Sequence, residues 1–135
     1  MKKVMIFGTF DFLHQGHLNL FKQAKELGDF LIAVIARDST VKNVKKHNTM
    51  FNENQRLDAV KKFVNLAVLG NKDDKYKIIE EHRPDIICLG YDQKAFTETL
   101  EQELSKRNLK IKIIRLKPFK EHIFKSSKIK ERLSK

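Results

Sequence analysis

The 135-residue sequence contains one cysteine, no tryptophan, two prolines and five glycines. The single cysteine excludes an internal disulfide and a cysteine-rich metal site. Because Cys88 lies within the apolar run 85–89, we expect it to be a small core residue. Internal repeats, low-complexity tracts and interdomain linkers are absent too, so we expect a single domain, residues 1–135.

Long apolar runs are also missing from the sequence. None approaches the roughly 20 residues that cross a bilayer, and the start of the chain lacks the apolar region and cleavage site of a secretory signal. We therefore expect a soluble, cytoplasmic protein with no membrane partner. Hydrophobic residues make up 41% of the chain, which is compatible with a packed core.

Acidic residues are few relative to basic ones. The 17 Asp and Glu oppose 28 Lys and Arg, which gives a formal net charge of +11. Such a charge suits anionic partners in general: nucleoside triphosphates, phosphorylated metabolites, nucleic acid or an anionic membrane. Charge alone does not choose among them.

Short apolar runs alternate with helical patterns along the chain. We predict strands at 4–7, 29–35, 65–69, 85–89 and 109–116, and helices at 18–27, 53–63, 72–82, 95–107 and from 126 onward. Residues 36–50 have little apolar periodicity and predict a basic loop. This alternation predicts an α/β fold: a single doubly wound, Rossmann-like sheet of five parallel strands flanked by helices, with the fifth strand at or near an edge.

The first predicted strand is followed by GTFDFLHQGH, residues 8–17, which we call the signature. A strand–loop–helix corner of this kind faces the crevice where ligands bind, and the amides that begin its helix can bind an anion. His14 and His17 are three residues apart, so both imidazoles can point at one spot. Gly8 permits a sharp exit from the strand, and Gly16 gives the backbone room to approach a phosphate. A histidine pair alone more often consists of ordinary surface or core residues without a functional role. The complete stretch, however, predicts a site for a phosphate chain.

Basic side chains follow the second predicted strand at the same edge of the sheet. Lys42, Lys45 and Lys46 lie in the predicted basic loop, from which they can reach a polyphosphate. Arg56 lies in the first turns of the next helix and can aim its guanidinium at the same phosphates. The alternative for each of them is an ordinary solvated surface residue.

Two further segments carry groups suited to a nucleotide. The fourth strand runs into Gly90-Tyr91-Asp92-Gln93, where a carboxylate and a carboxamide can recognise a base or ribose and the tyrosine can pack on a ring; the alternative is a plain turn. Ser126 and Ser127 begin the terminal helix, where a serine can cap the helix and also bind phosphate.

Three separated motifs carry a family resemblance. The signature resembles GTFDxxHxGH of the cytidylyltransferase-like nucleotidyltransferase superfamily. ENQR at 53–56 resembles its E-x-x-R element, and FKSSKI at 124–129 resembles its terminal S-[ST]-[ST]-K-I motif, here with two hydroxyl residues. VIARDSTV, VLGNKDD and LGYDQ, at 34–41, 68–74 and 89–93, are more similar to the archaeal FAD synthetases than to the small cytidylyltransferases.

The resemblance implies nucleotidyl transfer. A phosphate oxygen of an acceptor attacks the α-phosphorus of a nucleoside triphosphate, and pyrophosphate leaves without a covalent enzyme intermediate. It favours AMP transfer from ATP to FMN, which gives FAD. The alternative is CTP-dependent activation of glycerol 3-phosphate or a similar polyol or sugar phosphate. The resemblance also implies a homodimer and a divalent cation, Mg²⁺, Co²⁺ or Mn²⁺, carried with the substrate phosphates.

The same resemblance implies residue roles. The catalytic residues would be His14, His17 and Lys46. Nucleotide would be bound by Gly8, Thr9, Phe10, His14, His17, Gly90, Tyr91, Asp92, Ser126 and Ser127. The acceptor or phosphates would be bound by Asp11, Lys42, Arg56 and Arg115. No dedicated metal cage is visible, and Asp11 is a candidate magnesium ligand.

The tail of the chain departs from the cytidylyltransferase pattern. Where those enzymes have R-T-x-G-I-S-T-T, this chain has Arg115 followed by LKPFKEHIFKSS, so the motifs leave the acceptor site open. Phe119 and Phe124 can stack on a flavin or pack in the core. A different class of function, a basic nucleic-acid-binding module on the same fold, is disfavoured because no recognised DNA- or RNA-binding motif accompanies the charge.

Overall fold

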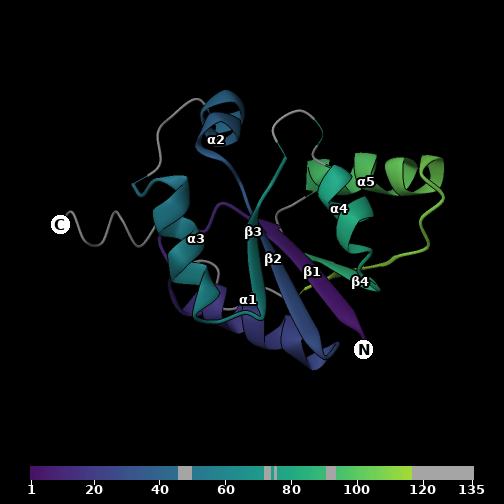
Figure 1. Cartoon of the computed structure of the whole chain (residues 1–135), viewed down its shortest axis with the longest axis horizontal. Helices are drawn as coiled ribbons and strands as arrows, with labels where there is room; N and C mark the ends of the chain where they lie inside the picture. The colour runs from purple at the N-terminus through teal and green to yellow at the C-terminus, as the bar shows by residue number, and fades with distance from the viewer. Residues whose placement is uncertain (46–49, 72–73, 75, 91–93, 117–135) are drawn as a thin grey trace.

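The computed structural model describes residues 1–45, 50–71, 74, 76–90 and 94–116, which form a five-stranded parallel sheet with helices on both faces (Figure 1). The strands are β1 (Lys3–Gly8), β2 (Phe30–Ile35), β3 (Leu66–Leu69), β4 (Ile86–Leu89) and β5 (Lys112–Arg115). The helices are α1 (Gln15–Glu26), α2 (Asp38–Lys45), α3 (Glu53–Lys61), α4 (Lys77–His82) and α5 (Lys94–Lys106). The strand order is β3-β2-β1-β4-β5, which confirms the predicted doubly wound α/β fold with β5 at an edge.

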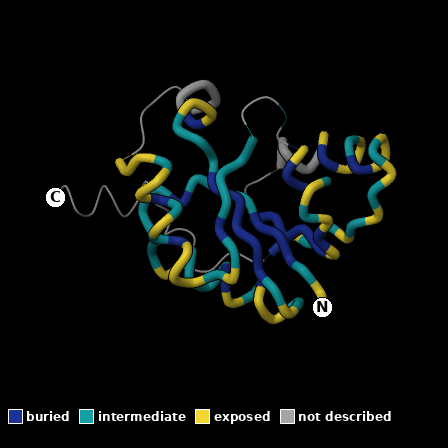
Figure 2. The backbone as a smooth tube through the Cα atoms, viewed as in Figure 1, coloured by how far each residue is buried: buried dark blue, intermediate teal, exposed yellow. Residues whose placement is uncertain are grey.

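Alternating side chains of the strands build one core on each face of the sheet. Val4 and Ile6 of β1 join a cluster that includes Phe21 and Ala24 of α1 and Val60 of α3. The intervening residue of β1, Met5, joins a second cluster with Ile79 of α4 and Leu100 of α5. The central strands are consequently buried along most of their length (Figure 2). Cys88 lies in the first cluster, as predicted, and burial raises the pKa of its thiol to about 11.

Register brings the ends of three strands together at the carboxyl edge. Gly8 at the end of β1 is paired with Ile35 at the end of β2, and the Ala36 amide donates to the Gly8 carbonyl at 2.9 Å. The Gly70 amide, after β3, donates to the Ile35 carbonyl at 3.0 Å. The segments that leave β1, β2 and β3 therefore begin side by side.

The predicted basic loop at 36–50 is wrong in its first half, because Asp38–Lys45 forms α2. Val41 is buried, and its amide donates to the Arg37 carbonyl at 3.0 Å. The amide of Asp38, in the first turn, donates to the Glu53 carboxylate of α3 at 2.9 Å. A distant carboxylate thus satisfies an amide that a helix leaves unpaired at its start, and no local periodicity reveals it.

The other predicted helices differ from the observed ones mainly at their ends. Helix α4 begins at Lys77 instead of residue 72, and α3 ends at Lys61 with Phe63 exposed. The predicted terminal helix lies outside the described residues. Within the part of the chain that the structure describes, no helix is long and apolar enough to cross a membrane.

Candidate active site

The signature turns away from β1 at Phe10, which has a left-handed backbone with a φ of 54°. Its ring is buried and lies over Gly8, where an added Cβ would come within 2.7 Å of the ring carbon Cζ. The same ring packs 5.6 Å from both Phe21 and His17. The expectation that Gly8 supplies the sharp turn is therefore wrong: Gly8 supplies space for a ring, and Phe10 makes the turn at a cost that its burial offsets.

The two histidines cap α1 for each other. His14 is the N-cap, and its Nδ1 accepts from the Gly16 amide at 3.0 Å. The Nδ1 of His17 accepts from the His14 amide at 3.4 Å, and the two ring centroids are 4.1 Å apart. A nitrogen that accepts carries no proton, so a neutral His14 has its proton on Nε2. The cap thus fixes His14 as a donor through Nε2 at the start of α1.

The surroundings of both histidines lower their pKa values, which favours the neutral imidazole at pH 7. Burial, together with the neighbouring His14, lowers the pKa of His17 to about 4, against a hydrogen bond to the Phe12 backbone that raises it. Burial also lowers the pKa of His14. His14 can therefore contact a phosphoryl oxygen as a neutral N–H donor through Nε2, and a bound triphosphate would raise its pKa. The Nδ1 of His17 accepts from the His14 amide, and its ring also bonds the Phe12 backbone.

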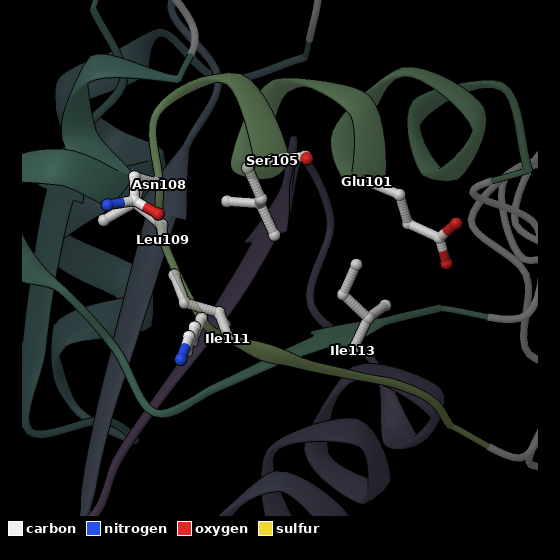
Figure 3. Close-up of a pocket in the computed structure, with 8 residues that line it drawn as sticks. Glu101, Ser105, Asn108, Leu109, Ile111 and Ile113 are labelled. Atoms are coloured by element: carbon white, nitrogen blue, oxygen red, sulfur yellow. The ribbon is translucent and has the colours of Figure 1, made fainter.

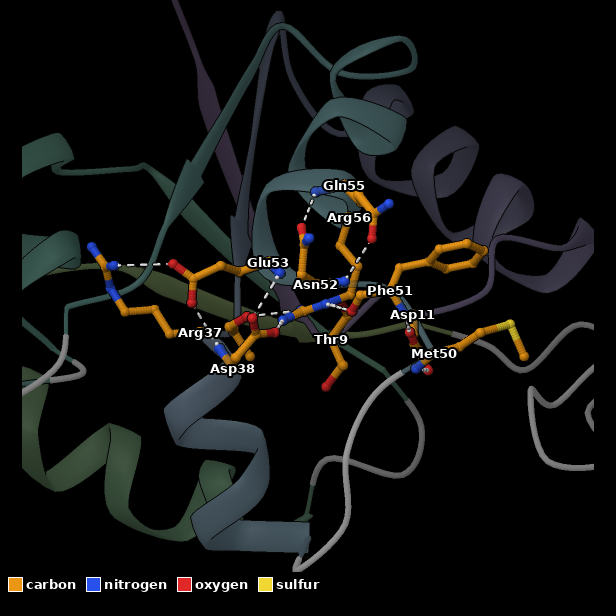
Figure 4. A network of polar contacts seen from close by, with 11 residues as sticks. Thr9, Asp11, Arg37, Asp38, Met50, Phe51, Asn52, Glu53, Gln55 and Arg56 are labelled. Carbon is orange, nitrogen blue, oxygen red and sulfur yellow. Dashed lines mark hydrogen bonds and ion pairs between the residues drawn. The ribbon is translucent and has the colours of Figure 1, made fainter.

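The carboxyl edge is held together by a buried arginine, Arg56 of α3 (Figure 4). Its side chain has no exposed surface. It donates to the carbonyls of Thr9 and Ala36 at 2.8 Å each and to that of Phe51 at 3.1 Å. It also binds the Asp38 carboxylate at 2.7 Å. We predicted that Arg56 aims its guanidinium at phosphates. In the structure the guanidinium is buried and instead binds the segments that leave β1 and β2.

Helices α2 and α3 cap each other beside this arginine. The Asp38 amide donates to Glu53 at 2.9 Å, and the Glu53 amide donates to Asp38 at 3.1 Å. Each carboxylate therefore lies at the positive end of the other's helix. Desolvation raises the pKa of Asp38, but the hydrogen bonds from Arg56 and the Glu53 amide outweigh it and leave this pKa below its usual value. Arg37 joins the network by donating to the Gly70 carbonyl at 2.6 Å and to Glu53 at 3.4 Å.

Asp11 connects the signature to the chain that enters α3. One of its carboxylate oxygens accepts from the Met50 amide and the other from the Phe51 amide, at 2.8 Å each. In this structure Asp11 therefore holds the chain that enters α3 against the signature. Among the described residues, no group of three or more His, Cys, Asp or Glu could hold a metal ion.

The remaining predicted site residues divide by position. Gly90 is buried after β4, and its carbonyl accepts from the Arg115 guanidinium at 2.7 Å, so Arg115 lies beside the predicted nucleotide-recognition turn. Lys42 lies in α2, and its side chain is outside the description. Outside the described residues altogether are Lys46, Tyr91, Asp92, Ser126 and Ser127. The signature residues from Gly8 to His17 and Arg56 are brought to one edge.

A separate cavity of about 470 Å³ lies between α5 and the approach to β5 (Figure 3). Leu104, Leu109, Ile111 and Ile113 supply its apolar lining, and its polar lining residues are Glu101, Ser105, Asn108 and Lys110. Most of these residues precede β5 or lie near the end of α5, so the cavity belongs to the amino end of the sheet. It is therefore distinct from the signature edge.

A parallel sheet of this order, with a histidine-capped helix at the carboxyl end of its central strand, defines an α/β nucleotidyltransferase. The chain belongs to the cytidylyltransferase-like family, whose model matches residues 5–132. This confirms the predicted family and the predicted class of enzyme.

Relatives and solved structures agree with this assignment. The FAD synthase of Aciduliprofundum boonei is 50% identical over 121 residues, 88% of this chain and 80% of the relative. The FAD synthase of Methanosarcina mazei is 47% identical over 123 residues, which cover 90% of this chain and 80% of the relative. A crystal structure described as the lipopolysaccharide core biosynthesis protein from Thermoplasma volcanium superposes with a TM-score of 0.83 at 42% identity, covering 88% of this chain and 98% of that one.

Proposed function

We propose that this enzyme is an FMN adenylyltransferase, which transfers AMP from ATP to FMN and releases pyrophosphate. The observation that carries the proposal is the 50% identity to a FAD synthase over 88% of the chain. The segments that resemble archaeal FAD synthetases, 34–41, 68–74 and 89–93, also coincide with the ends of β2, β3 and β4. Parallel strands end at the edge where substrates bind, so the resemblance concentrates where specificity is decided.

The proposed reaction needs mainly positioning and electrostatic stabilisation. A phosphate oxygen of FMN bonds to the α-phosphorus of ATP as the bond from that phosphorus to the bridging oxygen of the β-phosphate breaks. Negative charge moves onto the leaving pyrophosphate. The Nε2–H of His14 donates to a phosphoryl oxygen beside the first amides of α1, and His17 packs against it to hold the ring.

We propose that the divalent cation arrives with the triphosphate. Both oxygens of Asp11 accept loop amides, which supports a cation held chiefly by substrate oxygens and water. Such a cation would neutralise charge on the phosphates. A homodimer and a cytoplasmic location are part of the same proposal, which for these two rests on the family resemblance.

The deciding experiment measures pyrophosphate release by the purified protein with Mg²⁺ or Co²⁺. ATP and CTP are each combined with FMN and with glycerol 3-phosphate, and FAD is separated by chromatography. We expect release only with ATP plus FMN, together with FAD. Release with CTP plus glycerol 3-phosphate would instead establish the alternative, a polyol phosphate cytidylyltransferase. If none of the four combinations released pyrophosphate, both choices of acceptor would be contradicted.

A further inference from the structure

Two of the segments that resemble the archaeal FAD synthetases, 34–41 and 68–74, are joined at the carboxyl edge of the sheet. Arg37 follows β2, and its Nε donates to the carbonyl of Gly70, which follows β3, at 2.6 Å. Its Nη1 also donates to the Glu53 carboxylate of α3 at 3.4 Å. The guanidinium of Arg37 therefore lies at the ends of β2 and β3.

Part of the Arg37 guanidinium is left unused by the protein. The group carries N–H donors on three nitrogens in one plane, and within the part of the chain that the structure describes only Nε and Nη1 have acceptors. The side chain is 28% exposed, and its Nη2 is not among the buried unpaired atoms. Because the bond to Gly70 fixes the plane of the fork, Nη2 is available to a ligand at this edge.

The residue after Gly70 carries an unpaired acceptor. The Oδ1 of Asn71 is buried and has no hydrogen-bond partner, which is true of no other side-chain nitrogen or oxygen atom among the described residues. A buried acceptor without a donor destabilises a protein and calls for an explanation. Asn71 as a whole is half-buried, and a rotation of its amide exchanges the positions of Oδ1 and Nδ2. The amide can thus present its oxygen at the edge where Arg37 lies.

The ends of β2 and β3 suit the distant part of a long acceptor. The signature follows β1, which has β4 on one side and β2 on the other. Because the predicted nucleotide-recognition turn follows β4, a triphosphate at the histidines with its base toward β4 leaves the β2 side to the acceptor. Figure 4 shows Arg37 at one end of the polar network and Asp11 of the signature at the other.

The spacing of the strands separates the phosphate of the acceptor from its ring. Neighbouring strands are about 4.8 Å apart, which places the gap between β2 and β3 roughly 5–10 Å from β1. A phosphate in that gap would be out of reach of the α-phosphorus at the signature. The ring of FMN, which the ribityl chain separates from the phosphate, would reach the gap.

We propose that Arg37 and Asn71 bind the pyrimidine edge of the isoalloxazine ring and so select a flavin as the acceptor. This inference rests on the proposed function and adds two residues to the predicted site. The edge presents two carbonyls with an N–H between them. A carbonyl accepts from Nη2 of Arg37, and the N–H donates to the amide oxygen of Asn71. Glycerol 3-phosphate has no such edge and is too short to extend from the signature to β3.

The first test is the kinetics of Arg37→Met with Arg107→Met as the matched control. Loss of a charged hydrogen bond should raise the KM for FMN roughly tenfold or more and leave the KM for ATP near that of the wild type. Arg107 is also partly exposed and paired with carboxylates, but it lies at the end of α5, so the control should leave both constants unchanged. An unchanged KM for FMN, or equal rises for FMN and ATP, would overturn the role of Arg37.

Riboflavin, which has the ring but no phosphate, tests which part of the acceptor Arg37 binds. As a competitive inhibitor against FMN, it should lose affinity for Arg37→Met by the same factor as FMN does. A raised KM for FMN with an unchanged inhibition constant for riboflavin would assign Arg37 to the phosphate and overturn the ring contact. Riboflavin that fails to inhibit the wild type would contradict the ring contact too.

Arg37→Lys keeps the proposal testable if Arg37→Met does not fold. The ammonium preserves a positive charge beside Glu53, so the urea midpoint should stay near that of the wild type. It cannot replace the planar fork, so the KM for FMN should still rise several-fold. A wild-type KM for FMN in a folded Arg37→Lys protein would overturn the proposal.

Asn71→Ala separates a role in binding from a role in folding. The variant removes an oxygen that the folded protein leaves unpaired, so its urea midpoint should equal or exceed that of the wild type while the KM for FMN rises several-fold. A lowered midpoint with normal FMN kinetics would refute the role of Asn71. Wild-type protein that forms FAD beside Arg37 and Asn71 variants with normal FMN kinetics would refute this inference alone. Wild-type protein that forms no FAD would refute the proposed function and the inference with it.

Discussion

Two arginines in this molecule bind several partners each, but in opposite surroundings. Arg56 has no exposed side-chain surface and holds three carbonyls and one carboxylate at the signature edge. Arg107 at the end of α5 is 22% exposed and pairs with three carboxylates, Asp74, Glu80 and Glu103. A surface pair can exchange its partner for water, whereas a buried charge cannot. The number of contacts therefore says less about an arginine than its access to solvent.

The largest effect should come from Arg56→Met. Removing the guanidinium takes its hydrogen bonds from the carbonyls of Thr9 and Ala36, each worth about 1.5–3 kcal/mol for a charged donor, whereas Asp38, whose side chain is 45% exposed, can be hydrated. Urea unfolding followed by circular dichroism measures the loss. Arg56→Lys should recover only part of it, because a single ammonium cannot replace the planar fork. A midpoint equal to that of the wild type would mean that Arg56 does not organise this edge.

Replacing His14 should separate chemistry from folding. His14→Ala removes a donor to the reacting phosphate and should lower kcat by roughly 10²- to 10³-fold. It also removes a helix cap, worth about 1 kcal/mol. His14→Asn should restore the cap and the unfolding midpoint without restoring turnover. Steady-state kinetics with urea unfolding on both variants makes the comparison. Full activity in His14→Asn would show that His14 acts through the cap alone.

Arg107→Met should destabilise the protein several-fold less than Arg56→Met. The carboxylates that it leaves are partly exposed and can be hydrated. Its ring contact with Tyr76, 5.5 Å from the centroid, is lost as well. Parallel unfolding curves of the two variants test this ranking. Equal losses would mean that solvent access does not distinguish the two arginines.

The smallest expected effect is on the stability of the protein at acid pH. Desolvation raises the pKa of Asp38 but its hydrogen bonds more than reverse this, and the Tyr76 amide and Arg107 lower the pKa of Asp74. A lowered folded-state pKa gives stability that is present above the unfolded value of about 3.9 and is lost as pH falls toward the folded value. Asp74→Asn should therefore flatten the dependence of stability on pH below about pH 4. Unfolding curves between about pH 5 and 2.5 would reveal an unaltered slope if Asp74 plays no part.

The signature corner could be predicted from sequence because its parts are close together. Its strand, its histidine pair and its helix lie within residues 3–26, and their spacing carries the information. Arg56 could not be interpreted in the same way, because its carbonyl partner at Thr9 is 47 residues away. A lone helical arginine looks like a surface residue until the exits of β1 and β2 are placed around it. Helix α2 could not be predicted for the same reason, because Glu53, which caps it, lies 15 residues after Asp38.

The exposed pair Met50 and Phe51 shows a second limit of sequence patterns. Apolar residues at the start of a helix are normally assigned to the core. Only the hydrogen bonds of Asp11 show that their backbone is fixed although Met50 is 52% and Phe51 39% exposed. The phenylalanines that the sequence suggested for a flavin, Phe119 and Phe124, lie outside the described residues.

The pairing of β1 also has a consequence for how the chain is made. Val4 pairs with Ile86, so the central strand leaves the ribosome long before one of its two neighbours exists. At about 5–20 residues per second, β1 waits roughly 4–16 s for β4. During this interval β2 pairs with one edge of β1, and the backbone N–H and C=O groups of the other edge stay unpaired. The nascent enzyme should thus be most prone to aggregation before translation passes β4, and slowing the ribosome between β2 and β4 should lower the soluble yield.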